Sequence, residues 1–191
     1  MADSASGSGR ARIEFENYRF RGKFRFELSG ENLRVDFAHS SLLGAVQAEG
    51  SLFLSPDGMI MLDREKSKLY EDEECRRLAA EAAGASVTPD DIMLALQLSY
   101  PPYRDAGEAG AELSGNAWRI KGVWGERRLE FYGQSGRELN MMKISRLDRA
   151  WSFTVRYRYG AFGRDYPERI EIIKEDRSVR ITLEVERFSE S

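Results

Sequence analysis

The stretch YRFRGKFRFEL, residues 18–28, alternates apolar and charged side chains along its whole length. Aromatic or aliphatic residues and one glycine occupy the even positions, while arginine, lysine or glutamate occupies every odd position. Because successive side chains of a strand point to opposite faces, this period of two predicts a strand with one apolar and one charged face. The turn sequence Ser29-Gly30-Glu31-Asn32 follows, and residues 33–37 alternate again, which predicts a hairpin with one wet face.

The same alternation recurs in both halves of the chain. It predicts further strands at residues 46–54, 59–62, 66–70, 118–124, 129–131, 139–144, 151–159, 170–172 and 179–185. Short turn sequences, such as Ser55-Pro56-Asp57-Gly58, join most of them. We therefore expect a mainly β (α+β) protein, built on a curved antiparallel sheet of about nine to eleven strands.

Two helices are expected in the middle of the chain. Acidic residues at 72–74 favour a helix N-terminus, and the apolar spacing carries a helix over Asp72–Ala83. Thr88 and Pro89 then supply an N-cap and a first-turn proline, which predicts a second helix over Pro89–Leu98. Residues 105–115, rich in glycine, alanine and glutamate, are expected to form a loop.

Length and composition limit the class of protein. The chain has 191 residues, 29 basic and 32 acidic, with a formal net charge of −3, which argues against general nucleic-acid binding. No apolar run approaches the roughly 18–20 residues of a membrane-spanning helix. Residues 1–10, small and polar, are expected to be a flexible leader or the remnant of signal removal and cloning, followed by a single domain over 11–191.

Catalytic and metal-binding patterns are sparse. His39 is the only histidine, and Ser40 or Ser41 beside it is the one serine–histidine pairing that leaves a hydrolase open as an alternative. Cys75 is the only cysteine, so it can form neither an intramolecular disulfide nor a thiolate metal cluster. Residues 133–136 are expected to be a hairpin turn and not a nucleophile elbow. We expect no enzyme, no metal and no cofactor.

The apolar face of the predicted sheet is the informative feature. It carries more large side chains than two short helices would cover, and small-ligand sites are concave and mostly apolar. The alternative is that these side chains simply pack against the helices. The expected lining consists of Phe24, Phe26, Val35, Phe37, Leu52, Leu54, Trp118, Ile120, Phe131, Phe153 and Val155, with Ile92 and Leu96 from the second helix.

From Tyr18 to Phe188 the chain resembles the LolA/LolB lipoprotein carriers, and it is closer to LolB. The resemblance rests on the order of strands, two helices and strands, and on four segments. These are residues 18–22, residues 33–44 with Ser40-Ser41-Leu42-Leu43-Gly44, residues 87–98, and residues 166–185. The family fold is an incomplete antiparallel barrel capped by a helical lid, which holds acyl chains of lipoproteins. The resemblance implies the same fold and ligand class here.

The resemblance also implies a location and a membrane contact. It places the protein in the periplasm. Anchoring to the outer membrane through an N-terminal lipid is a further possibility, which these residues do not decide because they contain no lipobox cysteine. Leu43 corresponds to the protruding leucine of the LolB loop, although Ser41-Leu42 stands where LolB has Asn-Pro. Leu42 and Leu43 are therefore expected to touch a membrane transiently, or alternatively to pack against the barrel rim.

The expected partners are lipidated proteins or acyl chains, and no nucleic acid. A different use of the same fold stays open, since one fold supports several functions. The chain would then be an envelope scaffold or sensor that binds a protein partner.

Overall fold

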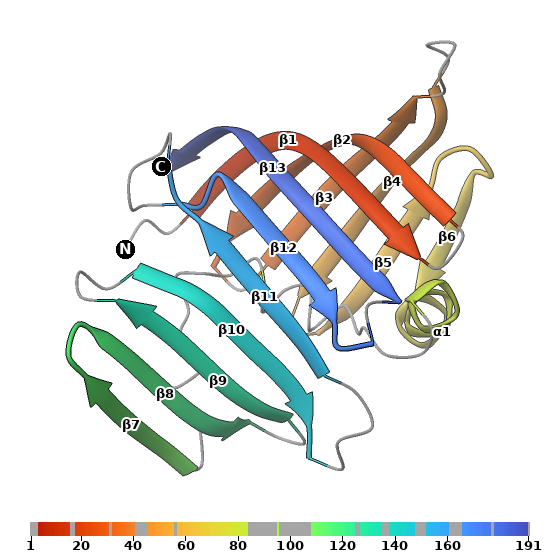
Figure 1. The fold of residues 1–191 in the computed structure, drawn as a ribbon. Coiled ribbons are helices and arrows are strands. Elements are labelled where there is room, and N and C mark those ends of the chain that lie inside the picture. The colour runs from red at the N-terminus through yellow and green to blue at the C-terminus, as the bar shows by residue number, and fades with distance from the viewer. Residues whose placement is uncertain are drawn as a thin grey trace. The chain divides into compact units, whose positions relative to one another are not determined.

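The computed structural model contains thirteen strands and one helix among the residues it describes (Figure 1). The described residues are 4–15, 18–30, 32–40, 46–55, 57–83, 95, 108–124, 127–134, 138–147, 152–160, 166–176 and 178–190. The strands are hydrogen-bonded in the order β6-β5-β4-β3-β2-β1-β13-β12-β11-β10-β9-β8-β7. Except where β1 lies beside β13, sheet neighbours are also sequence neighbours, as hairpin connections produce.

Two compact units divide the chain. The first comprises Met1–Met93 and Leu183–Ser191, and the second comprises Leu94–Thr182. The first unit contains β1 (Ser4–Phe15), β2 (Tyr18–Ser29), β3 (Asn32–Ser40), β4 (Val46–Ser55), β5 (Gly58–Asp63), β6 (Lys68–Glu71), α1 (Asp72–Ala83) and most of β13 (Val179–Glu190). The second contains β7 (Glu108–Ser114), β8 (Ala117–Trp124), β9 (Arg127–Gln134), β10 (Glu138–Arg146), β11 (Ser152–Arg158), β12 (Arg169–Lys174) and the start of β13.

The antiparallel, mainly β prediction is confirmed, and the strand number is higher than expected. Every strand pair with a resolved register is antiparallel. The eleven stretches predicted from alternation all contain strands. The two additional strands are β1 and β7, both rich in small residues.

The first ten residues are not a flexible leader throughout, because Ser4–Arg10 forms the first part of β1. Ser4 pairs with Ser29 of β2, and the register continues without a break to Phe15. The small side chains have a packing reason. A Cβ at Gly7 would meet the ring of Phe26, and a Cβ at Gly9 would meet the backbone carbonyl of Glu184 in β13. Small residues here let β2 rings and the β13 backbone approach β1 closely.

β7 corrects the expected loop over residues 105–115. Glu108–Ser114 pairs with β8 over seven residues, from Glu108 opposite Val123 to Ser114 opposite Ala117. Gly110 has no atom within 4 Å of the position a Cβ would take. β7 stands at the end of the strand order, so its side chains need not be apolar. Its sequence therefore lacks the alternation of large apolar and polar residues by which the other strands were predicted.

The first predicted helix is confirmed with the expected bounds. α1 runs over Asp72–Ala83 with Asp72, Glu73 and Glu74 in its first turn. The Asp72 carboxylate accepts a hydrogen bond from the backbone N–H of Met59 (2.8 Å), which ties the helix start to β5. Buried Cys75 donates from Sγ to the carbonyl of Tyr70 (3.0 Å), and burial raises the pKa of its thiol. Cys75 is therefore placed as a packing residue of this helix.

The second predicted helix, Pro89–Leu98, lies outside the described residues except for Ala95. Ala95 is helical and fully buried.

Candidate functional site

The predicted lining residues of the first unit share one sheet face. Phe24 of β2 lies opposite Phe37 of β3, and Phe26 lies opposite Val35, which in turn lies opposite Leu52 of β4. Leu54 lies on the same face, opposite Leu33. Directly opposed side chains in an antiparallel pair contact each other, so these residues form continuous apolar rungs across β2, β3 and β4.

Glycines on neighbouring strands determine how the rings of this face lie. A Cβ at Gly50 would meet the ring of Phe37, as one at Gly7 would meet the ring of Phe26. The two rings therefore extend sideways over glycine positions of β4 and β1. The rings of Phe24 and Phe26 are near-parallel, with centroids 6.3 Å apart. No side chain projects from these glycine positions to interrupt the apolar surface. We call this surface the apolar floor; it consists of Phe24, Phe26, Val35, Phe37, Leu52 and Leu54.

Burial is uneven across the floor. Phe24, Phe26 and Leu54 are buried, whereas Val35, Phe37 and Leu52 remain partly accessible. The accessible part therefore runs over the middle of β3 and β4.

The predicted residues of the second unit also share one face. Ile120 of β8 lies opposite Phe131 of β9, and Phe131 lies opposite Met142, which lies opposite Val155 of β11. Phe153 and Val155 are completely buried, whereas Ile120 is partly accessible. Packing therefore covers this face over β11 and leaves it partly open toward β8.

Trp118 lies at the open end of the same face. Its ring is partly accessible, and its Nε1 donates to the backbone carbonyl of Gln134 (3.1 Å). Leu113, the cross-strand neighbour of Trp118 in β7, is 84% exposed. The β7–β8 end of the second unit thus offers apolar surface to solvent.

Ile92 and Leu96, the expected lid residues, lie outside the described residues. Ala95 between them is described, and the hydroxyl of Tyr157 donates to its backbone carbonyl (3.2 Å). Burial raises the pKa of Tyr157 well above its ordinary value, so the hydroxyl stays a neutral donor. Ala95 therefore contacts β11 within the second unit.

Leu42, Leu43 and Ser41 also lie outside the described residues, so the expected membrane contact and the serine–histidine pairing stay predictions. His39 lies in β3, near its end, and donates from Nδ1 to the backbone carbonyl of Arg21 (2.6 Å).

The polar face of the first unit carries an ordered cluster of charges. Asp36 accepts hydrogen bonds from Ser51 (2.6 Å) and Arg34 (3.2 Å). Burial alone would raise the pKa of Asp36, but these hydrogen bonds outweigh it and hold the pKa below its usual value. An equivalent cluster in the second unit joins Arg119 to Glu130 (2.7 Å). Both are structural ion pairs on sheet surfaces.

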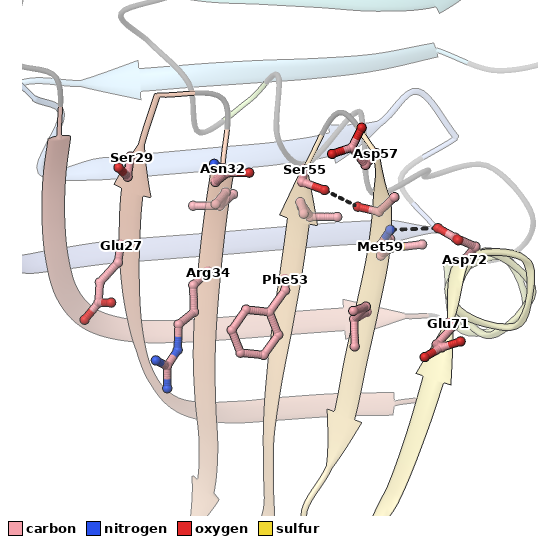
Figure 2. Close-up of a pocket in the computed structure, with 14 residues that line it drawn as sticks. Glu27, Ser29, Asn32, Arg34, Phe53, Ser55, Asp57, Met59, Glu71 and Asp72 are labelled. Carbon is pink, nitrogen blue, oxygen red and sulfur yellow. Dashed lines mark hydrogen bonds between the residues drawn. The ribbon is translucent and has the colours of Figure 1, made fainter.

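A hollow at the ends of the first unit's strands was not predicted. It has a volume of about 500 Å³ and lies beside the turns that end β2 and β4 and the junction of β6 with α1 (Figure 2). Its walls include Glu27, Arg34, Phe53 and Glu71, which project from one face of β2, β3, β4 and β6. Leu33, Leu54 and Met59 line it from the other face. One sequence signal pointed to it: β4 and β5 contain the runs LFL and MIML, which are apolar in both phases of the alternation.

The described residues hold neither a cluster of three or more side chains suited to a metal ion nor a helix that is long and apolar enough to cross a membrane.

Comparison with known proteins gives likenesses of structure and none of sequence. No family model and no curated protein matches the chain. A DUF1329 family protein from Desulfovibrio piger superposes with a TM-score of 0.70 at 8% identity, covering 100% of this chain and 87% of the other. A putative outer membrane lipoprotein-sorting protein domain from Vibrio parahaemolyticus gives 0.66 at 7% identity, covering 98% and 85%. The fold of this chain is therefore similar to the folds of these two proteins, and a closer likeness to LolB is not shown.

Proposed function

We propose that the protein is a non-enzymatic carrier that binds the acyl chains of lipids or lipidated proteins on its apolar sheet faces. The observation that carries this proposal is the apolar floor over β2–β4, whose central residues Val35, Phe37 and Leu52 remain accessible. An acyl chain laid on such a floor removes apolar surface from water, at about 0.8 kcal/mol for each buried methylene.

The structural likeness supports the ligand class. One similar structure is described as an outer membrane lipoprotein-sorting protein domain. By analogy we propose a periplasmic location and a LolB-like role, in which the protein receives lipoproteins and inserts them at the outer membrane. Leu42 and Leu43 would make the transient membrane contact, and an N-terminal lipid would be needed for stable residence, since even one acyl chain anchors only marginally.

The direct test is to identify what the protein holds. Purified protein is extracted into organic solvent for mass spectrometry, and the delipidated protein is titrated with a fluorescent fatty acid. We expect copurifying lipid and saturable uptake. Absence of both would contradict the proposal.

Two neighbouring residues of β4 provide a matched pair of variants. Leu52→Gln places an amide on the apolar floor, where an unpaired polar group disfavours an acyl chain, and should weaken fatty acid uptake. Phe53→Gln makes the same kind of change on the opposite face and should leave uptake unchanged. If Leu52→Gln lowers the stability of the protein, fatty acid uptake is measured instead on Val35→Thr, which keeps the side-chain volume. Equal uptake by the Leu52 and Phe53 variants would show that the floor does not bind the ligand.

The hydrolase alternative has its own test. If His39 acts as a base for Ser40 or Ser41, the protein should turn over a nitrophenyl ester and His39→Ala should abolish this activity. We expect no turnover by either protein.

A further inference from the structure

The polar face of β4–β6 carries a group of exposed apolar side chains. Phe53 is 38% exposed, Ile60 39% and Leu69 51%. Phe53 and Ile60 lie directly opposite each other in the register of β4 and β5. Leu62 lies two residues along from Ile60 on the same face, opposite Leu69. Single exposed apolar residues are common, but a contiguous group indicates an interaction surface.

This group borders the hollow of about 500 Å³ described above. Phe53 and Ile60 are apolar lining residues of the hollow, and Arg34 stacks over the Phe53 ring at 5.3 Å from the centroid. Figure 2 shows Glu27, Arg34, Phe53 and Glu71 side by side along this face. The volume lies within the range of small-ligand sites, and it would accommodate a few side chains of a partner.

The charges around the hollow are mostly negative. Four carboxylates line it, those of Glu27, Asp57, Glu71 and Asp72, against the single guanidinium of Arg34. Arg34 already pairs with Asp36 (3.1 Å), and Glu27 pairs with Arg25 (2.9 Å), so the charges left for a partner are mainly those of Asp57 and Glu71. Asp57 and Glu71 are exposed, and neither forms an ion pair with another described residue.

This charge selects among possible occupants. Anionic lipid surfaces and nucleic acids would be repelled by the carboxylates. A second copy in a two-fold arrangement would bring the same acidic patch against itself. A positively charged segment would be attracted, and an apolar side chain next to its charge would cover Phe53 and Ile60.

We propose that this hollow docks a segment of a partner protein in which an aliphatic or aromatic side chain lies beside lysine or arginine residues. Phe53 alternates with Leu52 and Leu54 along β4, so its side chain lies on the sheet face opposite the apolar floor. The hollow meets the floor face only at the strand ends, where Leu33 and Leu54 also line it. A carrier with both surfaces binds its cargo on one sheet face and a protein partner on the other.

The test uses three synthetic twelve-residue peptides with a fluorescent label. One alternates lysine with valine, one alternates lysine with serine, and one alternates glutamate with valine. We expect the lysine–valine peptide to bind at least about tenfold more tightly than either of the others, because only it matches both the carboxylates and the exposed Phe53 and Ile60. Binding should weaken as salt is raised. Equal binding of the lysine–serine peptide would show unspecific attraction to an acidic protein and overturn the proposal.

Variants locate the binding on the protein. Phe53→Gln should weaken binding of the lysine–valine peptide about fivefold or more, because it removes the central aromatic contact. Leu52→Gln should leave it unchanged. Glu71→Lys should weaken it about threefold or more, whereas the matched charge reversal Glu65→Lys, at an exposed turn residue outside the hollow, should have a smaller effect.

Each contrary result has a definite meaning. Equal effects of Glu71→Lys and Glu65→Lys, or no effect of Phe53→Gln, would overturn the proposal. A concentration-dependent dimer that Phe53→Gln dissociates would assign the surface to a second copy and also overturn it. Fatty acid uptake is measured on the same variants and should respond to Leu52→Gln and not to Phe53→Gln. Loss of peptide binding with intact uptake would therefore concern the docking site alone, and the reverse result would concern the lipid proposal alone.

Discussion

Ser51 and Asp36 are joined by a short hydrogen bond on the polar face of the first unit. Ser51 is 1% exposed, and its hydroxyl donates to Asp36 Oδ1 at 2.6 Å. Ser51→Ala should therefore lower the free energy of unfolding by about 1 kcal/mol near neutral pH, the usual net value of such a bond. Urea denaturation measures this loss.

The loss should depend on pH in one direction. The folded pKa of Asp36 lies below its ordinary value of about 3.9, so on acidification the unfolded state takes up the proton first. The stabilisation is complete above that ordinary pKa and disappears as the pH falls through the lower folded value. Wild type and Ser51→Ala should thus converge in strong acid. Ser145→Ala is the control, because this hydroxyl donates to the neutral carbonyl of Arg128 and its effect should not change with pH.

Leu43 provides a second prediction for a single residue, and it rests on the sequence. Leu43→Glu should leave folding almost unchanged and weaken liposome association, since burying one leucine in an apolar phase contributes roughly 1.5–3 kcal/mol. Leu113→Glu is a matched control, because Leu113 is 84% exposed in β7 and is not expected to touch the membrane. A loss of several kcal/mol of stability in Leu43→Glu would show that this leucine is a core residue.

Glycines in two strands give a matched test of packing within elements. Gly9→Val should destabilise the protein by at least about 1–3 kcal/mol, because the new side chain would meet the β13 backbone at Glu184 and β1 would have to move. Gly110→Val in β7 should be tolerated, because no atom of the described residues, apart from its chain neighbours, lies within 4 Å of the new Cβ. Thermal unfolding compares the two variants, and a similar change in both would contradict the close approach of β1 and β13.

The same elements show what the sequence could and could not predict. Alternation identified every strand with an apolar face, and acidic first-turn residues identified α1 with its bounds. β1 was missed because neighbouring strands pack closely against Gly7 and Gly9. Glycines at such positions replace the large apolar side chains that alternation would detect. For the candidate site, alternation predicted that Phe24, Val35 and Leu52 share a face. It could not predict which of them stay accessible, since that depends on how distant segments cover the sheet.

The pairing of β1 with β13 leads to a prediction for the whole molecule. β1 lies between β2 and β13 in the strand order, and Arg10 contacts Glu186 across 176 residues of sequence (2.5 Å). Removing residues 1–15 should expose the edges of both neighbours, and exposed edges promote aggregation. We expect loss of cooperative unfolding in urea and aggregation on gel filtration.

A rearranged chain is the control for this deletion. Gly7 meets Arg187 and Gly9 meets Glu184, so β1 and β13 run in opposite directions and Ser4 lies near the end of β13. A variant in which Ser4–Phe15 follows Glu190 through a short linker should therefore fold and unfold cooperatively. If the protein without residues 1–15 unfolds in urea as cooperatively as the full chain, β1 contributes little to stability and the prediction is wrong.

The pairing of β1 and β13 also has a consequence for biosynthesis. Ribosomes add roughly 5–20 residues per second, so the 176 residues that separate Arg10 from Glu186 take about 9–35 s to emerge. During that time β1 can form its hairpin with β2, but its other edge has no partner. The nascent chain therefore presents an unpaired strand edge until translation is almost past β13, and such an edge can pair with other chains during that interval.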